Sequence, residues 1–213
     1  MKVGGRIDGS KDMGVSLDPS GCRIHAPTPI NVKMMYYPPA QTREELHEAC
    51  RFSIAVRAHL RAGAAGGRSS RGQAGRATFT DVTKNGPRTH KATNVGPTPF
   101  HNISFILKNR APAGTTVSDR SGVKGYTQIM DNARLRAWRV ALKPGEATGQ
   151  ITQTAPGLRV YVHGGVLAEM VPGSADRGMA PYEGDFIWQD AGQMRAVKNT
   201  GTTLIEFVEF ELK

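Results

Sequence analysis

The segment RVYVH at 159–163 carries three polar side chains that could take part in binding or catalysis: Arg159, Tyr161 and His163. Because they alternate with apolar residues, a strand would place all three on one face. If the apolar face forms the core, the polar face points away from it, towards another sheet or an interface. We therefore interpret Tyr161 and His163 as ligand-binding candidates, with a structural role as the alternative for His163.

Signatures of the common catalytic sites do not occur. The sequence contains no G-x-S-x-G, P-loop, dinucleotide glycine fingerprint or H-E-x-x-H. Cys22 and Cys50 form neither a C-x-x-C pair nor a disulfide framework, and neither has a recognisable histidine partner. Nucleophilic catalysis thus has no visible candidate, and this cysteine usage leads us to expect a reducing, cytoplasmic compartment.

The charge and hydropathy of the chain indicate which classes of partner to expect. The net charge of +10 raises the question of nucleic acid, but much of the excess lies at 61–76, RAGAAGGRSSRGQAGR, without interleaved aromatic residues. We expect a basic surface that attracts small anionic molecules, and no nucleic-acid partner. No apolar stretch approaches the roughly 18 residues of a membrane span, so no membrane partner is expected.

An internal repeat organises the chain. THKATNVGPTPFHNISFILK at 89–108 matches MRAVKNTGTTLIEFVEFELK at 194–213 without a gap, at a constant offset of 105 residues. Asn94 then falls on Asn199, and both segments end in an alternating apolar tail. This pattern predicts that one structural unit occurs twice.

Residues 42–63 fit two alternatives. Thr42 and Glu45 have the spacing of a helix capping box, whereas residues 52–60 alternate between apolar and polar types as a half-buried strand does. The repeat favours the strand, because LRVYVHGGV at 158–166 alternates in phase and contains adjacent glycines that a helix would resist.

The whole chain reads as short strands separated by turns rich in Gly, Pro and Asn, which is typical of a sandwich or barrel. The predicted strands cover 30–37, 52–60, 76–82, 89–95, 99–108, 135–143, 157–163, 165–171, 184–189, 194–199 and 203–212. We predict two β-domains, at 30–108 and 135–213, with an arm at 1–29 and a linker at 109–134.

The second half resembles the cupin superfamily. LKPGEATGQITQTAPGLRVYVHGGVL and PYEGDFIWQDAGQMRAVKNTG are similar to its two motifs, roughly G-x5-H-x-H-x3,4-E-x6-G and P-x-G-x2-H ending in H-x3-N. DNARLRAWRVALKPGE and FVEFELK are most similar to the small cupins grouped with β-alanine degradation proteins. The resemblance, good over 129–213 and weaker over 30–108, implies an all-β fold with two jelly-roll barrels (double-stranded β-helices), a bicupin.

Enzymes of this superfamily usually hold one divalent metal by three histidines and a glutamate. In the second barrel the resemblance places Ile151 and Gln153 at the H-x-H positions, Gly157 or Leu158 at the glutamate position and Arg195 at the last histidine position. We expect no metal there, because isoleucine cannot ligate, an amide is a poor ligand and arginine repels a cation. Arg195 could instead hold the carboxylate of a small ligand, or lie on the surface. We count Arg195 and Gln153 as ligand-binding candidates beside Tyr161 and His163.

Upstream of the matching tails the offset of the repeat becomes 106 residues, and it gives Glu45 and His47 for the H-x-H pair of the first barrel. The offset of 105 gives His90 for the last histidine. Two histidines and a carboxylate could hold iron, manganese, nickel or zinc with open positions. The alternative is that His90 is a hydrogen-bonded structural histidine and that Glu45 is solvated.

Three functional hypotheses follow. The preferred one is a bicupin of small-molecule, catabolic context, in which the second barrel lacks the metal site and is structural or binds an anionic ligand. The second is a metal-dependent dioxygenase or isomerase that acts from the first barrel. The third is an assembly or regulatory module whose sheet edges pair between subunits, and the sequence leaves a homodimer open.

Overall fold

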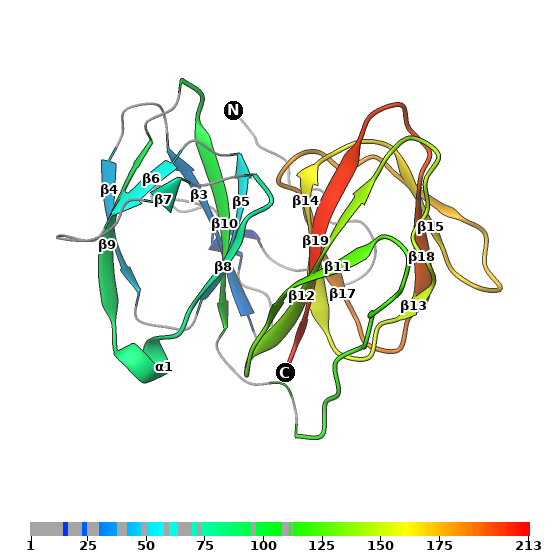
Figure 1. Ribbon diagram of the computed structural model, residues 1–213, viewed down its shortest axis with the longest axis horizontal. Helices are drawn as coiled ribbons and strands as arrows, with labels where there is room; N and C mark the ends of the chain where they lie inside the picture. The colour runs from blue at the N-terminus through cyan, green and yellow to red at the C-terminus, as the bar shows by residue number, and fades with distance from the viewer. Residues whose placement is uncertain are drawn as a thin grey trace. The chain divides into compact units, whose positions relative to one another are not determined.

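The computed structural model shows a chain built almost entirely from antiparallel β-sheets. It divides into two compact units, called here the first unit (Ser10–Asn109) and the second unit (Arg110–Lys213). Figure 1 shows that each unit contains two sheets that face each other. The residues that the structure describes are 15–16, 23–24, 30–37, 42–47, 51–57, 60–63, 70–71, 74–94, 97–107, 111 and 113–213.

The first unit has a six-stranded sheet in the order β1-β2-β3-β10-β5-β8 and a four-stranded sheet in the order β4-β9-β6-β7. Its strands are β1 (Val15–Ser16), β2 (Arg23–Ile24), β3 (Ile30–Tyr37), β4 (Thr42–His47), β5 (Arg51–Arg57), β6 (Leu60–Gly63), β7 (Ser70–Arg71), β8 (Ala77–Thr80), β9 (Arg88–Asn94) and β10 (Phe100–Leu107). A single-turn helix, α1 (Val82–Asn85), is capped by the Asp81 carboxylate, which accepts a hydrogen bond from the Thr83 amide over 3.0 Å. Across the described residues, no helix has the length and apolar character needed to cross a membrane.

The second unit has a five-stranded sheet in the order β11-β12-β19-β14-β17 and a four-stranded sheet in the order β13-β18-β15-β16. Its strands are β11 (Tyr126–Asp131), β12 (Leu135–Leu142), β13 (Ile151–Thr152), β14 (Gly157–His163), β15 (Leu167–Met170), β16 (Arg177–Met179), β17 (Phe186–Gln189), β18 (Met194–Asn199) and β19 (Ile205–Leu212).

The two units share one strand order, and this confirms the internal repeat. The run β3-β10-β5-β8 corresponds to β12-β19-β14-β17, and β4-β9-β6-β7 corresponds to β13-β18-β15-β16. The register agrees as well. Leu107 pairs with Ile30 as Leu212 pairs with Leu135, which keeps the offset of 105 residues found in the sequence.

The repeated asparagine has the same role in both units. The Asn94 side chain donates a hydrogen bond to the Thr98 carbonyl over 2.8 Å, and Asn199 donates to the Thr203 carbonyl over 2.8 Å. Each asparagine is fully buried and ties the end of a strand to the turn before the last strand of its unit. The repeat therefore preserves a turn, because buried backbone carbonyls need donors.

The apolar core of the second unit lies between its two sheets. The five-stranded sheet contributes Tyr126, Trp138, Val140, Leu142, Tyr161, Ile205 and Phe207, and the four-stranded sheet contributes Ile151, Leu167 and Val197. Burying an apolar side chain of this size contributes about 1.5–3 kcal/mol relative to leaving it exposed.

The strand prediction over 52–60 needs correction. One strand was expected over 52–60, but β5 and β6 belong to different sheets. Apolar alternation reports burial on one face of a strand, and it does not mark where the chain passes to the facing sheet. The helix alternative for 42–63 is also wrong, because β4, β5 and β6 are strands.

The linker and arm contain sheet strands. The stretch 109–134 includes β11, which pairs with β12, and its residues Ser118 and Arg120 are buried at 6% and 1% exposure. The arm at 1–29 includes β1 and β2, of which β2 pairs with β3. These strands escaped prediction because they lack a regular apolar alternation.

Candidate functional site

The structure brings Gln153 and Arg195 together inside the second unit. Ile151 on β13 pairs with Arg195 on β18, and Gln153 follows β13 on the same side of the alternation. Arg195 Nη2 donates a hydrogen bond to Gln153 Oε1 over 2.9 Å, and both side chains are buried. The two polar positions that the cupin resemblance singled out are therefore neighbours.

Glu209 on β19 lies at the centre of this polar cluster. Its carboxylate accepts hydrogen bonds from Arg159 Nε over 2.7 Å and from Arg195 Nη2 over 3.3 Å. Arg120 Nη1 also forms an ion pair with Glu209. One carboxylate thus meets three guanidinium groups, each on a residue at most 1% exposed.

Two further carboxylates balance the arginines. Glu211 pairs with Arg120 Nη2 over 2.7 Å and accepts the Ser118 amide over 2.7 Å. Glu169 on β15 pairs with Arg159 Nη2 over 3.1 Å and so connects the two facing sheets. The cluster contains three arginines and three glutamates, and their formal charges cancel.

Aromatic rings line the cluster. The Arg120 guanidinium lies 4.0 Å from the centre of the Trp138 ring and 4.9 Å from that of Tyr126. The Arg159 guanidinium lies 4.8 Å from the centre of the Phe207 ring. Cation–π contacts of this kind stabilise desolvated guanidinium groups.

The charges alter the pKa values of neighbouring groups. Burial alone would raise the pKa of the Glu209 carboxyl, but the positive charges of Arg195, Arg159 and Arg120 outweigh burial and hold that pKa well below its usual range. Burial, together with the charge of Glu209, raises the pKa of Tyr126 to about 12 despite the nearby arginines. Glu209 therefore remains ionised and Tyr126 neutral at physiological pH.

The polar face of β14 points towards the facing sheet at Arg159 and Tyr161, which was one of the two expected directions, but the core was expected on the other face of the strand. Arg159 and Tyr161 lie inside the unit, where Arg159 pairs with Glu209 and Tyr161 packs on Phe207 with ring centres 5.8 Å apart. A register irregularity follows Tyr161, and the side chain of His163 is 47% exposed, 4.0 Å from Glu206. Alternation misled because it assumes that charged residues face outwards, whereas here each buried charge has a partner.

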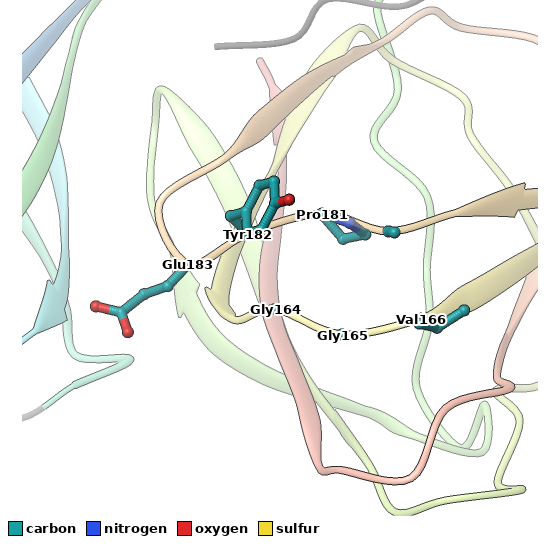
Figure 2. A pocket seen from close by; sticks show the side chains of 7 residues that line it. Gly164, Gly165, Val166, Pro181, Tyr182 and Glu183 are labelled. Carbon is teal, nitrogen blue, oxygen red and sulfur yellow. The ribbon is translucent and has the colours of Figure 1, made fainter. Parts of the chain in front are cut away.

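A shallow pocket of about 290 Å³ lies elsewhere on the second unit, beside the β14–β15 turn. Its lining residues are Gly164, Gly165, Val166, Ala180, Pro181, Tyr182 and Glu183. Figure 2 shows that the side chain of Glu183 extends away from Val166. The pocket holds no group of residues with an evident catalytic arrangement.

Comparison with known proteins identifies similar folds among solved structures but no related sequence family. No family model and no curated protein matches the sequence. Among solved structures, AerE from Microcystis aeruginosa is similar with a TM-score of 0.66 and 7% identity, over 91% of this chain and 91% of AerE. A cupin 2 conserved barrel domain protein from Leptotrichia buccalis has a TM-score of 0.53 and 11% identity, over 97% of this chain and 92% of that one.

The fold is that of the cupins. A third similar structure, salicylate 1,2-dioxygenase from Pseudoaminobacter salicylatoxidans with gentisate, has a TM-score of 0.57 and 13% identity. The match covers 85% of this chain and 68% of the dioxygenase. Cupin-fold neighbours of this protein thus include an enzyme that acts on a small molecule.

The interior of the second unit does not fit a divalent metal. Arg195 and Gln153 stand where the resemblance expects histidines, and two more guanidinium groups lie beside them. The glutamate position also fails. A Cβ atom on Gly157 would lie 1.8 Å from the Phe210 carbonyl oxygen, so no side chain fits there, while Leu158 is apolar.

The three metal candidates of the first unit are placed by backbone register alone. Glu45 on β4 pairs with His90 on β9, and His47 pairs with Arg88 two positions along. Strand alternation therefore assigns positions 45, 47 and 90 to one face of the four-stranded sheet. Their side chains lie outside the described part of the structure. Among the residues that it does describe, no three His, Cys, Asp or Glu side chains form a metal-binding group.

Sequence reasoning missed most of the charged cluster. Glu209 and Glu211 alternate with apolar residues in FVEFELK, and such alternation predicts a solvent-facing position. Their counterparts in the repeat, Ser104 and Ile106, carry no charge. Two charged residues inside the quoted motifs, Arg159 and Arg195, were the signal that could have indicated an internal network.

Proposed function

We propose that this chain is a bicupin of small-molecule metabolism in which the second barrel is metal-free and structural. The observation that carries the proposal is the Arg195 guanidinium, hydrogen-bonded to Gln153 and Glu209 at the position expected for a metal-binding histidine. The cluster around it ties both sheets together and leaves no set of ligands for a divalent cation.

The same cluster favours a structural role over the binding of an anionic ligand. Each of the three glutamates already pairs with at least one arginine, so an added anion would meet three fixed negative charges and no excess of positive charge. Buried charges are tolerated when they are paired and hydrogen-bonded, as here. Any substrate site is then expected in the first barrel.

Elemental analysis of the purified protein tests this proposal. The wild type and the double variant His47→Ala/His90→Ala would be dialysed against chelator, incubated with iron(II), manganese(II) or zinc(II), and desalted. The double variant should hold no stoichiometric metal, because the second barrel offers no ligands. One metal per chain in that variant would refute the proposal.

A second candidate function is a metal-dependent dioxygenase or isomerase that acts from the first barrel. The register of β4 and β9 favours it, because Glu45, His47 and His90 occupy one face at neighbouring positions. Two histidines and one carboxylate are a donor set suited to iron, manganese, nickel or zinc. A metal bound there would supply open positions for substrate oxygens.

Measurement of metal binding distinguishes a metal-dependent enzyme from a protein without a metal site. Titration with manganese(II), followed by the paramagnetic signal of the free ion, should give one site in the wild type and none in Glu45→Ala or His90→Ala. His101→Ala, a histidine change on β10 of the same unit, is the matched control and should retain the site. Oxygen uptake with gentisate as the probe substrate then tests dioxygenase activity. Equal metal binding by all four proteins would exclude these ligands.

A further inference from the structure

Three oxygen atoms from three different segments converge on Arg195. Gln153 Oε1 lies 2.9 Å from its Nη2, Glu209 Oε2 lies 3.3 Å from Nη2, and Glu169 Oε1 lies 3.5 Å from Nε. These residues follow β13 or lie on β19 and β15. All three are buried, with exposures of 1%, 1% and 7%.

Arg195 is held more loosely than the other two arginines of the cluster. Its Nε and Nη1 atoms have no hydrogen-bond partner within the described residues, although both are buried. Arg120 uses Nε, Nη1 and Nη2, and Arg159 does the same. The oxygens around Arg195 therefore surround a positive charge, but two of the three guanidinium nitrogens make no hydrogen bond to them.

We propose that Gln153, Glu169 and Glu209 form a monovalent-cation site of guanidinium type, which the protein fills with the side chain of Arg195. Arg195 is then the built-in cation of the second barrel. Once the side chain is shortened, the same oxygens should bind a free guanidinium ion from solution.

The charge of the cluster selects a monovalent cation. Without Arg195, two arginines would remain against three glutamates, which leaves a net charge of −1 in the barrel. One positive charge restores neutrality, whereas a divalent ion would leave an excess positive charge next to Arg120 and Arg159. In a poorly solvated interior such repulsion is much stronger than in water.

The walls of the site should survive the loss of Arg195. Glu209 remains fixed by Arg159 Nε over 2.7 Å and by Arg120. Glu169 remains paired with Arg159 over 3.1 Å, and Gln153 Oε1 keeps its hydrogen bond from Arg120 Nη2 over 3.0 Å. A planar ion with N–H donors in its plane matches carboxylate and amide oxygens in this arrangement.

The inference concerns the interior of the second barrel and rests on the proposed structural role of the cluster. Its test differs from the metal analysis above. If free guanidinium does not restore the thermal stability of an Arg195 variant, this inference fails but the proposal of a metal-free second barrel stands. A metal found in the second barrel by elemental analysis would overturn the metal-free proposal itself.

Thermal unfolding of Arg195→Ala tests the inference. The variant should melt about 10 °C below the wild type, since it leaves a buried carboxylate short of a partner. Millimolar guanidinium chloride should restore at least half of that loss, compared with sodium chloride at equal ionic strength. The wild type and Arg139→Ala should gain nothing, because the Arg139 side chain is 44% exposed in its pair with Glu206.

Two further arms keep the result decisive. If Arg195→Ala does not fold alone, refolding from urea with and without guanidinium chloride should show a guanidinium-dependent yield. Arg195→Lys keeps one positive charge, so it should melt above Arg195→Ala and respond less to guanidinium. An equal effect of sodium chloride, or a larger effect of magnesium chloride at matched ionic strength, would overturn the inference.

Discussion

Arg195 on β18 donates a hydrogen bond from Nη2 to Gln153 Oε1 over 2.9 Å, and Arg120 Nη2 donates to the same oxygen over 3.0 Å. A neutral amide thus joins two guanidinium groups that also share the Glu209 carboxylate. This contact connects the start of the second unit with the last strand of its four-stranded sheet, and it makes the polar interior of the barrel one continuous network.

Glu209→Gln should strongly destabilise the protein. The substitution keeps the shape but removes the charge that pairs with Arg120, Arg159 and Arg195, and breaking a buried ion pair typically costs about 3–5 kcal/mol. Urea unfolding followed by fluorescence measures the change. Asp131→Asn is the control, because its pairs with Arg136 and Lys213 are partly exposed, and it should cost less than about 1 kcal/mol. Similar losses in both variants would contradict the central role of Glu209.

Acid should destabilise the wild type more steeply than Glu209→Gln. The folded state holds the pKa of the Glu209 carboxyl well below its ordinary value of 4.5, so its contribution to stability is present above that pH and is lost as pH falls towards the folded-state pKa. Below about pH 4 the free energy of unfolding should fall by up to ~1.4 kcal/mol more per pH unit in the wild type. Parallel pH profiles for the two proteins would argue against this charge effect.

Alkaline pH should lower the stability of the protein through the ionisation of Tyr126. Its pKa is raised from 10.0 to about 12 in the folded protein, so its contribution is complete below pH 10 and is lost as pH rises from about 10 to 12. Tyr126→Phe should remove about 2 kcal/mol of this pH dependence, measured by urea unfolding between pH 9 and about 12. Tyr182→Phe, at a residue 77% exposed, should leave the profile unchanged. A steep profile that persists in Tyr126→Phe would assign the effect to another group.

Asn199→Ala should lower the free energy of unfolding by about 3 kcal/mol. The buried side chain donates to the Leu142 and Thr203 carbonyls, each over 2.8 Å, and accepts the Gly201 amide over 2.9 Å. Thr203→Ala is the matched change in the same turn and should be nearly neutral, because Asn199 contacts the Thr203 backbone. Equal effects of the two changes in urea unfolding would show that the hydrogen bonds of Asn199 do not hold the turn.

The sequence alone was enough to reveal the duplication and the β-class. Each follows from spacing along the chain, because strand alternation and a constant offset are local properties that the fold repeats in register. The recurrence of asparagine at positions 94 and 199 was likewise visible in the sequence, and its hydrogen bonds came from the structure.

Only the tertiary structure decided which charges lie inside. Arg120 and Glu209 are 89 residues apart in the sequence, and Arg159 reaches Glu169 from the opposite sheet. A charged side chain can be buried only where partners of opposite charge converge, and that convergence depends on how the sheets face each other. For this reason local alternation did not show that Arg159 and Tyr161 lie on the core face of β14, while the same rule placed their apolar neighbours in a strand correctly.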